Sequence, residues 1–370
     1  MRSGGSAPIG VGSGKSDGAR FAVTTATRAS VVTGALAIPL LALLAALPAF
    51  ASRVLMQELF YVFTMLTLAQ LWNLLAGSAG LISVGQQAFV GMGAYALFAF
   101  TVTAGLDPVP AIVLAGIVAG FVAVPAALIV FRLRGAYFAI GTWVVAEVCR
   151  LILAQVKQLG GGTGTSLPPD IASSMFALDF VRNLFQVRGP AARDIVAYWL
   201  ALLLALGTFA LVYRLLRSRH GLALSAIGDA EPAAESVGVD VFRTKLIIYV
   251  ATAMVTGMAG ALIFLQKARI SPDAAFSLID WTAYVIFIVV IGGIGTMEGP
   301  IIGVIIFYLL QYYLASLGSW YLIILGALAI LLMLFAPTGV WGVISQAFDV
   351  SLFPVRRRLK VQGGLDKAGP

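Results

Sequence analysis

Val109-Pro-Ala-Ile-Val-Leu-Ala-Gly-Ile-Val-Ala-Gly-Phe-Val-Ala-Val-Pro-Ala-Ala-Leu-Ile-Val-Phe131 is a run of 23 residues without a polar side chain. A helix rises about 1.5 Å per residue, so a run of this length crosses the ~30 Å hydrocarbon core of a bilayer. The strong alternation of apolar and polar residues that marks the strands of a membrane barrel is absent. The stretch therefore predicts a transmembrane helix.

The whole chain has the composition that such a stretch implies. Of its 370 residues, 60% are hydrophobic and 11% are charged, and the mean hydropathy is +0.99. A soluble domain has roughly 45–50% apolar and about 25% charged residues. A soluble fold of this length cannot bury so much apolar surface, so lipid must cover it. The sequence predicts an all-α, polytopic bundle of transmembrane helices.

Apolar stretches recur before and after residues 109–131. We expect about ten spans, at residues 31–50, 58–76, 83–104, 109–131, 136–156, 196–216, 245–265, 280–296, 300–317 and 320–336. Two spans have a second interpretation. Residues 83–104 are also consistent with a broken or re-entrant helix, and Ala49-Phe50-Ala51 resembles a signal-peptide cleavage site. The first stretch exceeds the usual h-region of about 7–15 residues, which favours a retained helix.

Positive charges are divided unevenly between the segments that connect these spans. With both termini in the cytoplasm, the cytoplasmic segments hold 16 Lys and Arg residues and the outer segments hold seven. Because cytoplasmic segments carry the excess of positive charge, we expect both termini there. The sequence thus predicts a disordered cytoplasmic tail at 1–30, a transmembrane domain at 31–342 and a basic cytoplasmic tail at 343–370.

Several classes of function are disfavoured. The net charge of +8 does not indicate a nucleic-acid partner, because the Lys and Arg residues lie between the spans. Residues 10–16 resemble a phosphate-binding loop but have Ile9 where that motif needs glycine. The chain has one cysteine, Cys149, and one histidine, His220, so we expect no disulfide, no metal site and no nucleophile–base pair. We therefore expect no catalytic residue, no bound cofactor and no enzyme activity in this chain.

Two connecting segments exceed the roughly 2–8 residues that join helices in a bundle. Residues 157–195 lie on the outer side and residues 217–244 on the cytoplasmic side. In the cytoplasmic segment, Asp229 is a capping residue, Pro232 suits a first helical turn and Gly238 suits a left-handed end. Either this short helix covers a loop or it docks on a cytoplasmic partner.

This loop carries a resemblance to a known family. Glu231-x-Ala233-Ala234-x-x-x-Gly238 is similar to the coupling loop of ABC importer permeases, and most similar to the permeases for branched-chain amino acids. Further stretches agree in the family order, at 81–95, 132–140, 147–150, 161–164, 291–300 and 336–342. The chain departs from the general motif at Pro232, where that motif has its glutamate, and it lacks the downstream Ile-x-Leu-Pro. The resemblance covers about residues 58–342.

The resemblance implies a permease subunit of an ATP-driven importer for branched-chain amino acids in the cell inner (plasma) membrane. It implies a second homologous permease, two ATP-binding cassette subunits that use the ATP, and an extracytoplasmic solute-binding protein. The coupling contact with the ATPase would then comprise Asp229, Glu231, Ala233, Ala234 and Gly238. A permease for urea or short amides is the alternative within the family, because specificity in such systems resides largely in the binding protein.

Glycines and polar side chains within the spans are further candidates. The glycines are expected to permit close helix packing or to break helices along a path, and they are Gly85, Gly91, Gly93, Gly292, Gly293 and Gly295. Gln86 and Gln87 are expected to line a polar path or to bridge helices, and Glu147 and Arg150 to form an ion pair. An ion-coupled secondary transporter, with Glu147 or Asp280 as its proton or sodium site, is the alternative from another class.

Overall fold

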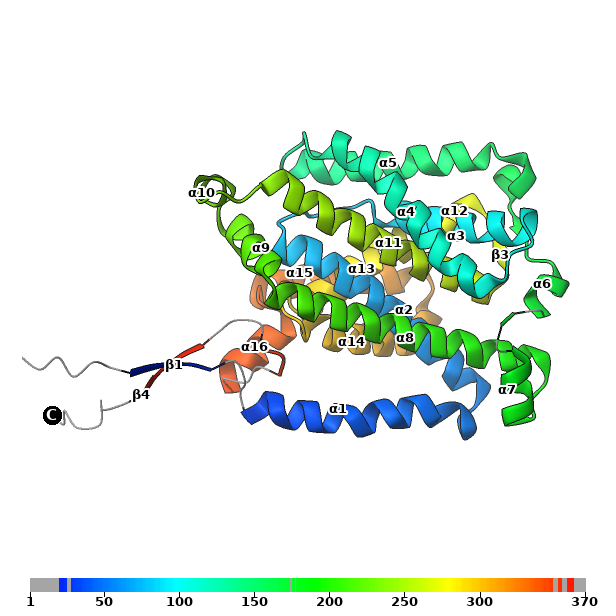
Figure 1. Cartoon of the computed structure of the whole chain (residues 1–370), viewed down its shortest axis with the longest axis horizontal. Helices are drawn as coiled ribbons and strands as arrows, with labels where there is room; N and C mark the ends of the chain where they lie inside the picture. The colour runs from blue at the N-terminus through cyan, green and yellow to red at the C-terminus, as the bar shows by residue number, and fades with distance from the viewer. Residues whose placement is uncertain are drawn as a thin grey trace, which may run out of the picture.

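The fold is a bundle of long helices that run side by side between two ends (Figure 1). A computed structural model describes residues 20–24, 28–173, 175–176, 178–348, 352–354 and 358–362. One end carries α10 (Glu231–Ser236) and the opposite end carries α7 (Leu178–Phe185), and we call them the α10 end and the α7 end. The predicted phosphate-loop resemblance, most of the predicted N-terminal tail and half of the predicted C-terminal tail lie outside the described residues.

The elements follow one another along the chain with few long connections. The longer helices are α1 (Arg28–Ala46), α2 (Arg53–Asn73), α3 (Gln86–Phe98), α4 (Pro108–Val130), α5 (Ala136–Ala154), α8 (Gly189–Arg217), α9 (Arg219–Asp229), α11 (Val241–Lys267), α14 (Gly299–Leu314), α15 (Ser319–Phe335) and α16 (Gly339–Phe348). The short helices and turns are α6 (Pro169–Ser173), α12 (Pro272–Ala275), α13 (Tyr284–Gly292), η1 (Leu47–Ala49), η2 (Leu74–Ser78), η3 (Ala99–Thr103), η4 (Lys157–Leu159), η5 (Gly161–Thr163), η6 (Ile279–Ala283) and η7 (Ala315–Leu317). Two short antiparallel pairs complete the described chain, β1 (Arg20–Thr24) with β4 (Arg358–Gln362) and β2 (Thr165–Ser166) with β3 (Arg269–Ile270).

The all-α membrane class is confirmed, whereas the count of ten spans is not. Seven helical stretches among the described residues are long and apolar enough to cross a membrane, at Arg53–Ser78, Pro108–Val130, Ala136–Ala154, Gly189–Arg217, Val241–Lys267, Pro272–Gly292 and Trp320–Phe348. Two shorter apolar helices, Thr33–Ala49 and Gly299–Leu314, correspond to the predicted spans 31–50 and 300–317. In the predicted span 83–104, regular helix begins only at Gln86, which agrees with a broken helix.

Several predicted boundaries were wrong for identifiable reasons. The helix expected at 280–296 ends at Gly292, because Gly293 adopts a φ of +123° that interrupts it. The last predicted span, 320–336, agrees with α15, but α16 follows it up to Phe348, inside the predicted C-terminal tail, after a break at Pro337, which disfavours helical geometry in the residue before it. The outer segment 157–195 is largely folded, and α8 begins within it at Gly189.

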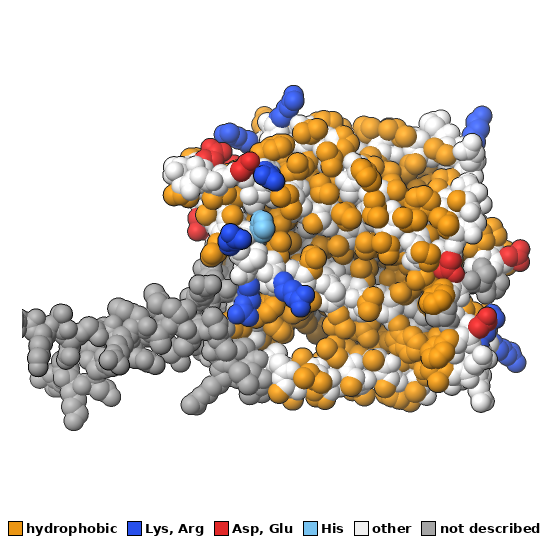
Figure 2. All heavy atoms as spheres, viewed as in Figure 1, with side chains coloured by type: hydrophobic (Ala, Val, Ile, Leu, Met, Phe, Trp, Pro, Cys, Tyr) orange, Lys and Arg blue, Asp and Glu red, His pale blue; other side chains and the backbone are white. Residues whose placement is uncertain are grey.

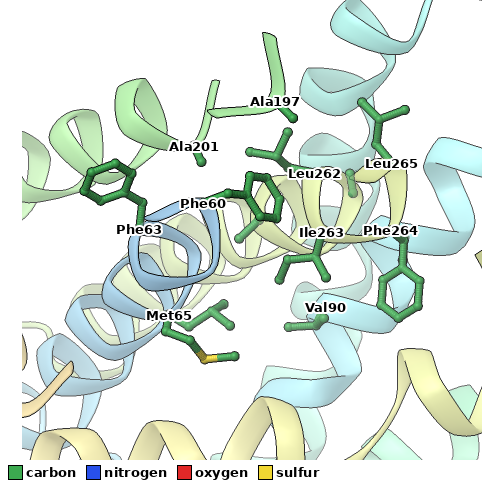
Figure 3. Close-up of a cluster of buried hydrophobic side chains, with 14 of the residues drawn as sticks. Phe60, Phe63, Met65, Val90, Ala197, Ala201, Leu262, Ile263, Phe264 and Leu265 are labelled. Atoms are coloured by element: carbon green, nitrogen blue, oxygen red, sulfur yellow. The ribbon is translucent and has the colours of Figure 1, made fainter. Parts of the chain in front are cut away.

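The core joins helices that are far apart in the sequence. Figure 3 shows Phe60 and Phe63 of α2 near Ala197 and Ala201 of α8, with side chains of α11 packed beside them. The surface between the two ends is mainly hydrophobic, and charged side chains gather at the ends (Figure 2). This distribution fits a bundle whose sides face lipid and whose ends face water.

Candidate functional site

The loop between α8 and α11 folds into two helices at the α10 end. Asp229 was predicted to cap the short helix, but it is the last residue of α9 and is exposed. Ala230 occupies the N-cap position of α10 and offers no capping side chain, and proline occupies its first turn. The predicted cap was wrong because the preceding residues continue α9 as a helix of 11 residues up to Asp229.

The end of α10 has the left-handed geometry that was expected. Gly238 has a φ of +88°, and its N–H donates to Glu235 O at 3.0 Å. The N–H of Val239 donates to Ala234 O at 3.1 Å. These bonds satisfy carbonyls that a helix end leaves free.

The two alanines of the loop motif have opposite surroundings. Ala234 is 1% exposed and belongs to a small core with Ile227 and Val241. Ala233 is exposed, and Val237 at the tip is 77% exposed. Ala234 therefore holds the loop together, while Ala233 and Val237 are available to another molecule.

An ion pair attaches α10 to the long helix that follows it. Glu231 accepts from the Nζ of Lys245, which lies in the first turns of α11. Asp240 caps α11, because its Oδ1 accepts from the backbone N–H of Arg243 at 2.9 Å. The ion pair and the cap thus connect α10 to the first turns of α11.

A second candidate region lies where α2 turns back into α3. The N–H of the Trp72 indole donates to Ser83 O at 2.8 Å, and Nε2 of Gln86 donates to Leu68 O at 3.0 Å. Leu68 lies ten residues before Ser78, where the helix formed by α2 and η2 ends. Because Gln86 is the first residue of α3 and contacts Leu68, α3 begins about 15 Å inside that end of α2–η2. Non-helical backbone at membrane depth is tolerated only inside protein or beside a water-filled cavity.

The two glutamines at the start of α3 face different neighbours. Oε1 of Gln87 accepts from the Thr282 hydroxyl, which bridges α3 to η6. Gln86 is 6% exposed, and its Oε1 has no hydrogen-bond partner among the described residues. It lines a cavity of about 10 Å³ together with Thr252 and Thr256 of α11, which is room for about one water molecule. Gln86 and Gln87 thus bridge helices, and Gln86 also borders a small polar cavity.

The segment between α13 and α14 returns to the same part of α2. The amide of Asn73 donates to Thr296 O at 2.8 Å and accepts from the N–H of Gly295 at 2.7 Å. Nε2 of Gln70 donates to Met297 O at 2.9 Å. Two non-helical segments, 79–85 and 293–298, therefore approach the last turns of one helix.

The predicted glycines lie at close contacts between elements. A Cβ added to Gly93 would lie 2.0 Å from Gly257 O, and one on Gly85 would lie 2.2 Å from Thr142 O. A Cβ on Gly91 would meet the Phe276 ring at 2.5 Å. Only glycine permits these approaches, because small residues let helices pack closely in lipid.

The glycines near residue 292 shape the turn between α13 and α14. A Cβ on Gly292 would lie 1.9 Å from Gly299 O, and Gly293 needs its positive φ. Gly295 has a φ of +79° and faces Gly77, whose own Cβ would lie 2.6 Å from it.

A larger cavity of about 730 Å³ opens at the α10 end beside this turn. It is lined by Gly77, Gly295, Arg217 and Asp229, and by Pro354 from the C-terminal segment. The buried carboxylate of Glu298 holds that segment, because Oε1 accepts from the N–H groups of Leu352 at 3.0 Å and Phe353 at 2.8 Å. This contact could not be predicted, because Glu298 stands in a glycine-rich motif 54 residues before Leu352.

The predicted ion pair forms within α5 and extends to a third residue. Arg150 Nη2 lies 2.6 Å from Glu147 Oε1, and its Nη1 lies 2.8 Å from Oδ1 of Asp273 in α12. The Glu147 side chain is 45% exposed. Asp280, in η6, is half-buried.

Sequence reasoning missed a buried carboxylate at the α7 end. Asp194 of α8 is 2% exposed and accepts from Arg53 and Gln57 of α2 and, at 2.8 Å, from Gln266 of α11. Asp194 falls within the predicted outer segment 157–195. The one signal for an ion pair with Arg53 was that each of the two residues adjoins an apolar stretch. Asp194 ties three helices together.

The comparisons with known proteins agree with this architecture. The sequence profile of a family described as "Branched-chain amino acid transport system / permease component" matches residues 54–335. The chain is 30% identical over 280 residues to the high-affinity branched-chain amino acid transport system permease protein LivM of Salmonella typhimurium, covering 72% of this chain and 65% of that protein. It is 29% identical over 309 residues to LivM of Escherichia coli, covering 80% of this chain and 69% of that protein.

A more distant relative is the probable branched-chain amino acid transport permease protein LivH of Methanocaldococcus jannaschii, 29% identical over 182 residues. That match covers 46% of this chain and 54% of the relative. No solved structure matches. The profile covers well over half of the chain, from the start of α2 to the end of α15. The chain therefore belongs to the family of branched-chain amino acid transport system permease components.

Proposed function

We propose that this chain is the permease subunit of an ATP-driven importer for branched-chain amino acids, and that it forms half of the translocation path. The relatives are named as permeases of branched-chain amino acid transport systems. The observation that carries the mechanism is the folded α9–α10 loop, which presents Ala233 and Val237 beyond the membrane helices.

In this proposal the protein lies in the inner membrane, and its α10 end faces the cytoplasm. Two ATPase subunits bind this chain and a second, homologous permease, with α10 in a groove of one ATPase. When ATP closes the ATPases, α10 moves, and the Glu231–Lys245 pair carries that movement into α11. α11 borders the Gln86 cavity through Thr252 and Thr256, so the movement reaches the broken start of α3.

At the α7 end, the folded segment from η4 to α7 is proposed to meet a solute-binding protein. Gly164 has a φ of +79°, and the adjoining β2 pairs with β3. This arrangement fixes the segment against the end of α11, from which β3 follows. Solute delivery at the α7 end and ATP-driven movement at the α10 end then both act on α11.

The test is uptake of radiolabelled leucine by proteoliposomes that contain the complete complex. We expect uptake that requires ATP and the loaded binding protein and that persists after proton and sodium gradients are dissipated. Uptake driven by an ion gradient without the ATPase subunits would contradict the proposal. Parallel assays with urea and acetamide, together with the solute retained by the binding protein, decide between the amino-acid and amide alternatives.

A further inference from the structure

One side of α5 is left exposed by the rest of the bundle. Phe138, Thr142 and Ala146 form its buried side. The opposite side carries large apolar residues that are 46–54% exposed, namely Ile140, Trp143, Val144, Val148 and Leu151. Only 17% of this span is buried within the chain.

Charged groups interrupt this apolar side. Glu147 follows Trp143 and precedes Leu151 by four residues each, which places the three on one face of the helix. Glu147 is eleven residues from Ala136, so its Cα lies about 16 Å along a helix of 19 residues. Together with Asp273, two carboxylates surround the single guanidinium of Arg150.

Glu147 and Arg150 lie within the α5 span, and intramembrane charges ordinarily face protein or water rather than lipid. α15 provides the contrast. Its span is also little buried, at 11%, but α15 itself (Ser319–Phe335) contains no charged residue. Lipid can therefore cover α15, whereas the exposed face of α5 calls for a protein surface.

We propose that the exposed face of α5 packs against the second permease subunit, with the Glu147–Arg150–Asp273 group at the interface. The inference rests on the proposed function, which supplies a homologous permease as the partner. Because the Glu147 side chain is 45% exposed although it pairs with Arg150, the partner presents a cation or N–H donors to its carboxylate.

The location connects the interface to the candidate path. The N–H of Val84 donates to the Thr142 hydroxyl at 3.0 Å, and Gly85 packs against the Thr142 backbone. α5 therefore lies between the partner and the broken start of α3. A translocation path between the two permeases would pass along this region.

Photo-crosslinking tests the interface in the assembled complex. p-Benzoylphenylalanine replaces Val148, native membranes are irradiated, and the adducts are identified by mass spectrometry. Matched positions are Leu203 of α8, 71% exposed, and Ile330 of α15, 60% exposed. We expect an adduct with the second permease from position 148 and no permease adduct from the other two. Capture of lipid alone at 148, or of the permease from 203 or 330 instead, would overturn the proposal.

A second measurement addresses the charged group. In the double variant Glu147→Leu/Arg150→Leu, a lipid-facing surface would keep or improve assembly, because both charges are removed from hydrocarbon. We expect instead at least a fivefold loss of the second permease from the purified complex, with this chain still inserted and monodisperse. Full retention of the second permease contradicts the inference. ATP-driven leucine uptake by the unmodified complex is measured in parallel, so failure of the proposed function is recognised independently of these two results.

Discussion

At the scale of single residues, the contact between Gly93 and Gly257 sets how closely α3 and α11 approach. A Cβ on Gly93 would lie 2.0 Å from the Gly257 carbonyl oxygen, whereas one on Gly207 of α8 would meet nothing within 4 Å. The sequence showed that both are glycines within apolar stretches. The sequence could not show which of the two glycines lies at a close contact, because Gly93 packs against Gly257, more than 160 residues away.

We expect Gly93→Ala to lower the free energy of unfolding by about 1–3 kcal/mol, since overpacking must push two backbones apart. Gly207→Ala should be neutral or stabilising by up to about 1 kcal/mol, because alanine favours helix. Thermal unfolding of the two variants in the same detergent provides the measurement. Equal stability of the two variants would show that the close contact has no energetic role.

Asn73 is a second residue whose role appears only in the structure. Its amide occupies both the Gly295 N–H and the Thr296 carbonyl. Asn73→Leu leaves these two groups unpaired, so we expect the free energy of unfolding to fall by about 2–6 kcal/mol, from about 1–3 kcal/mol for each group. Asn183, which is exposed in α7, serves as the control, and Asn183→Leu should leave the unfolding temperature unchanged. If Asn73→Leu unfolds at the same temperature as the control, the two hydrogen bonds of Asn73 do not stabilise the turn.

At the scale of elements, the short helix α10 was predicted from Pro232 and Gly238, and the structure has such a helix. The local signals suffice because proline and glycine restrict the backbone directly. Which alanine faces outward could not be predicted, because it depends on Ile227 and Val241 closing over Ala234. A bulky residue at Ala234 would therefore disrupt the loop itself, and Ala233 is the better position for a docking test.

The link between α10 and α11 can be tested by exchanging its charges. Glu231→Lys places two cations together, and we expect slower uptake together with a loss of stability above about 1 kcal/mol, because Lys245 is only 11% exposed and loses its counter-ion. Glu231→Lys/Lys245→Glu should recover most of the uptake. If the double variant is as slow as the single one, the ion pair does not transmit movement.

The C-terminal segment is attached to the 293–298 turn through Glu298. In Glu298→Ala the N–H groups of Leu352 and Phe353 lose their acceptor. Amide hydrogen exchange at these two residues should become at least tenfold faster. The control is Glu58→Ala. Glu58 lies near the start of α2, whereas the 293–298 turn contacts the end of that helix, so this variant should leave the exchange unchanged. Unchanged exchange in Glu298→Ala would mean that other contacts hold the segment.

At the scale of the whole molecule, composition and span length predicted the membrane class and most helix positions. These features are local, and lipid imposes the same length on every span. The departures occur at 79–85 and 293–298, where irregular backbone is stabilised by Asn73, Trp72 and other distant side chains. The predicted orientation depends largely on charges in the two tails, most of which lie outside the described residues, and it remains a prediction.

The whole account depends on α10 transmitting ATP-driven movement to a path between two permeases. The direct measurement is the number of leucine molecules imported per ATP hydrolysed, compared between the native complex and Ala233→Trp in proteoliposomes. We expect Ala233→Trp to insert and assemble normally but to import at least fivefold less leucine per ATP, because the added side chain obstructs docking at the exposed face of α10. A ratio equal to that of the native complex would contradict the account.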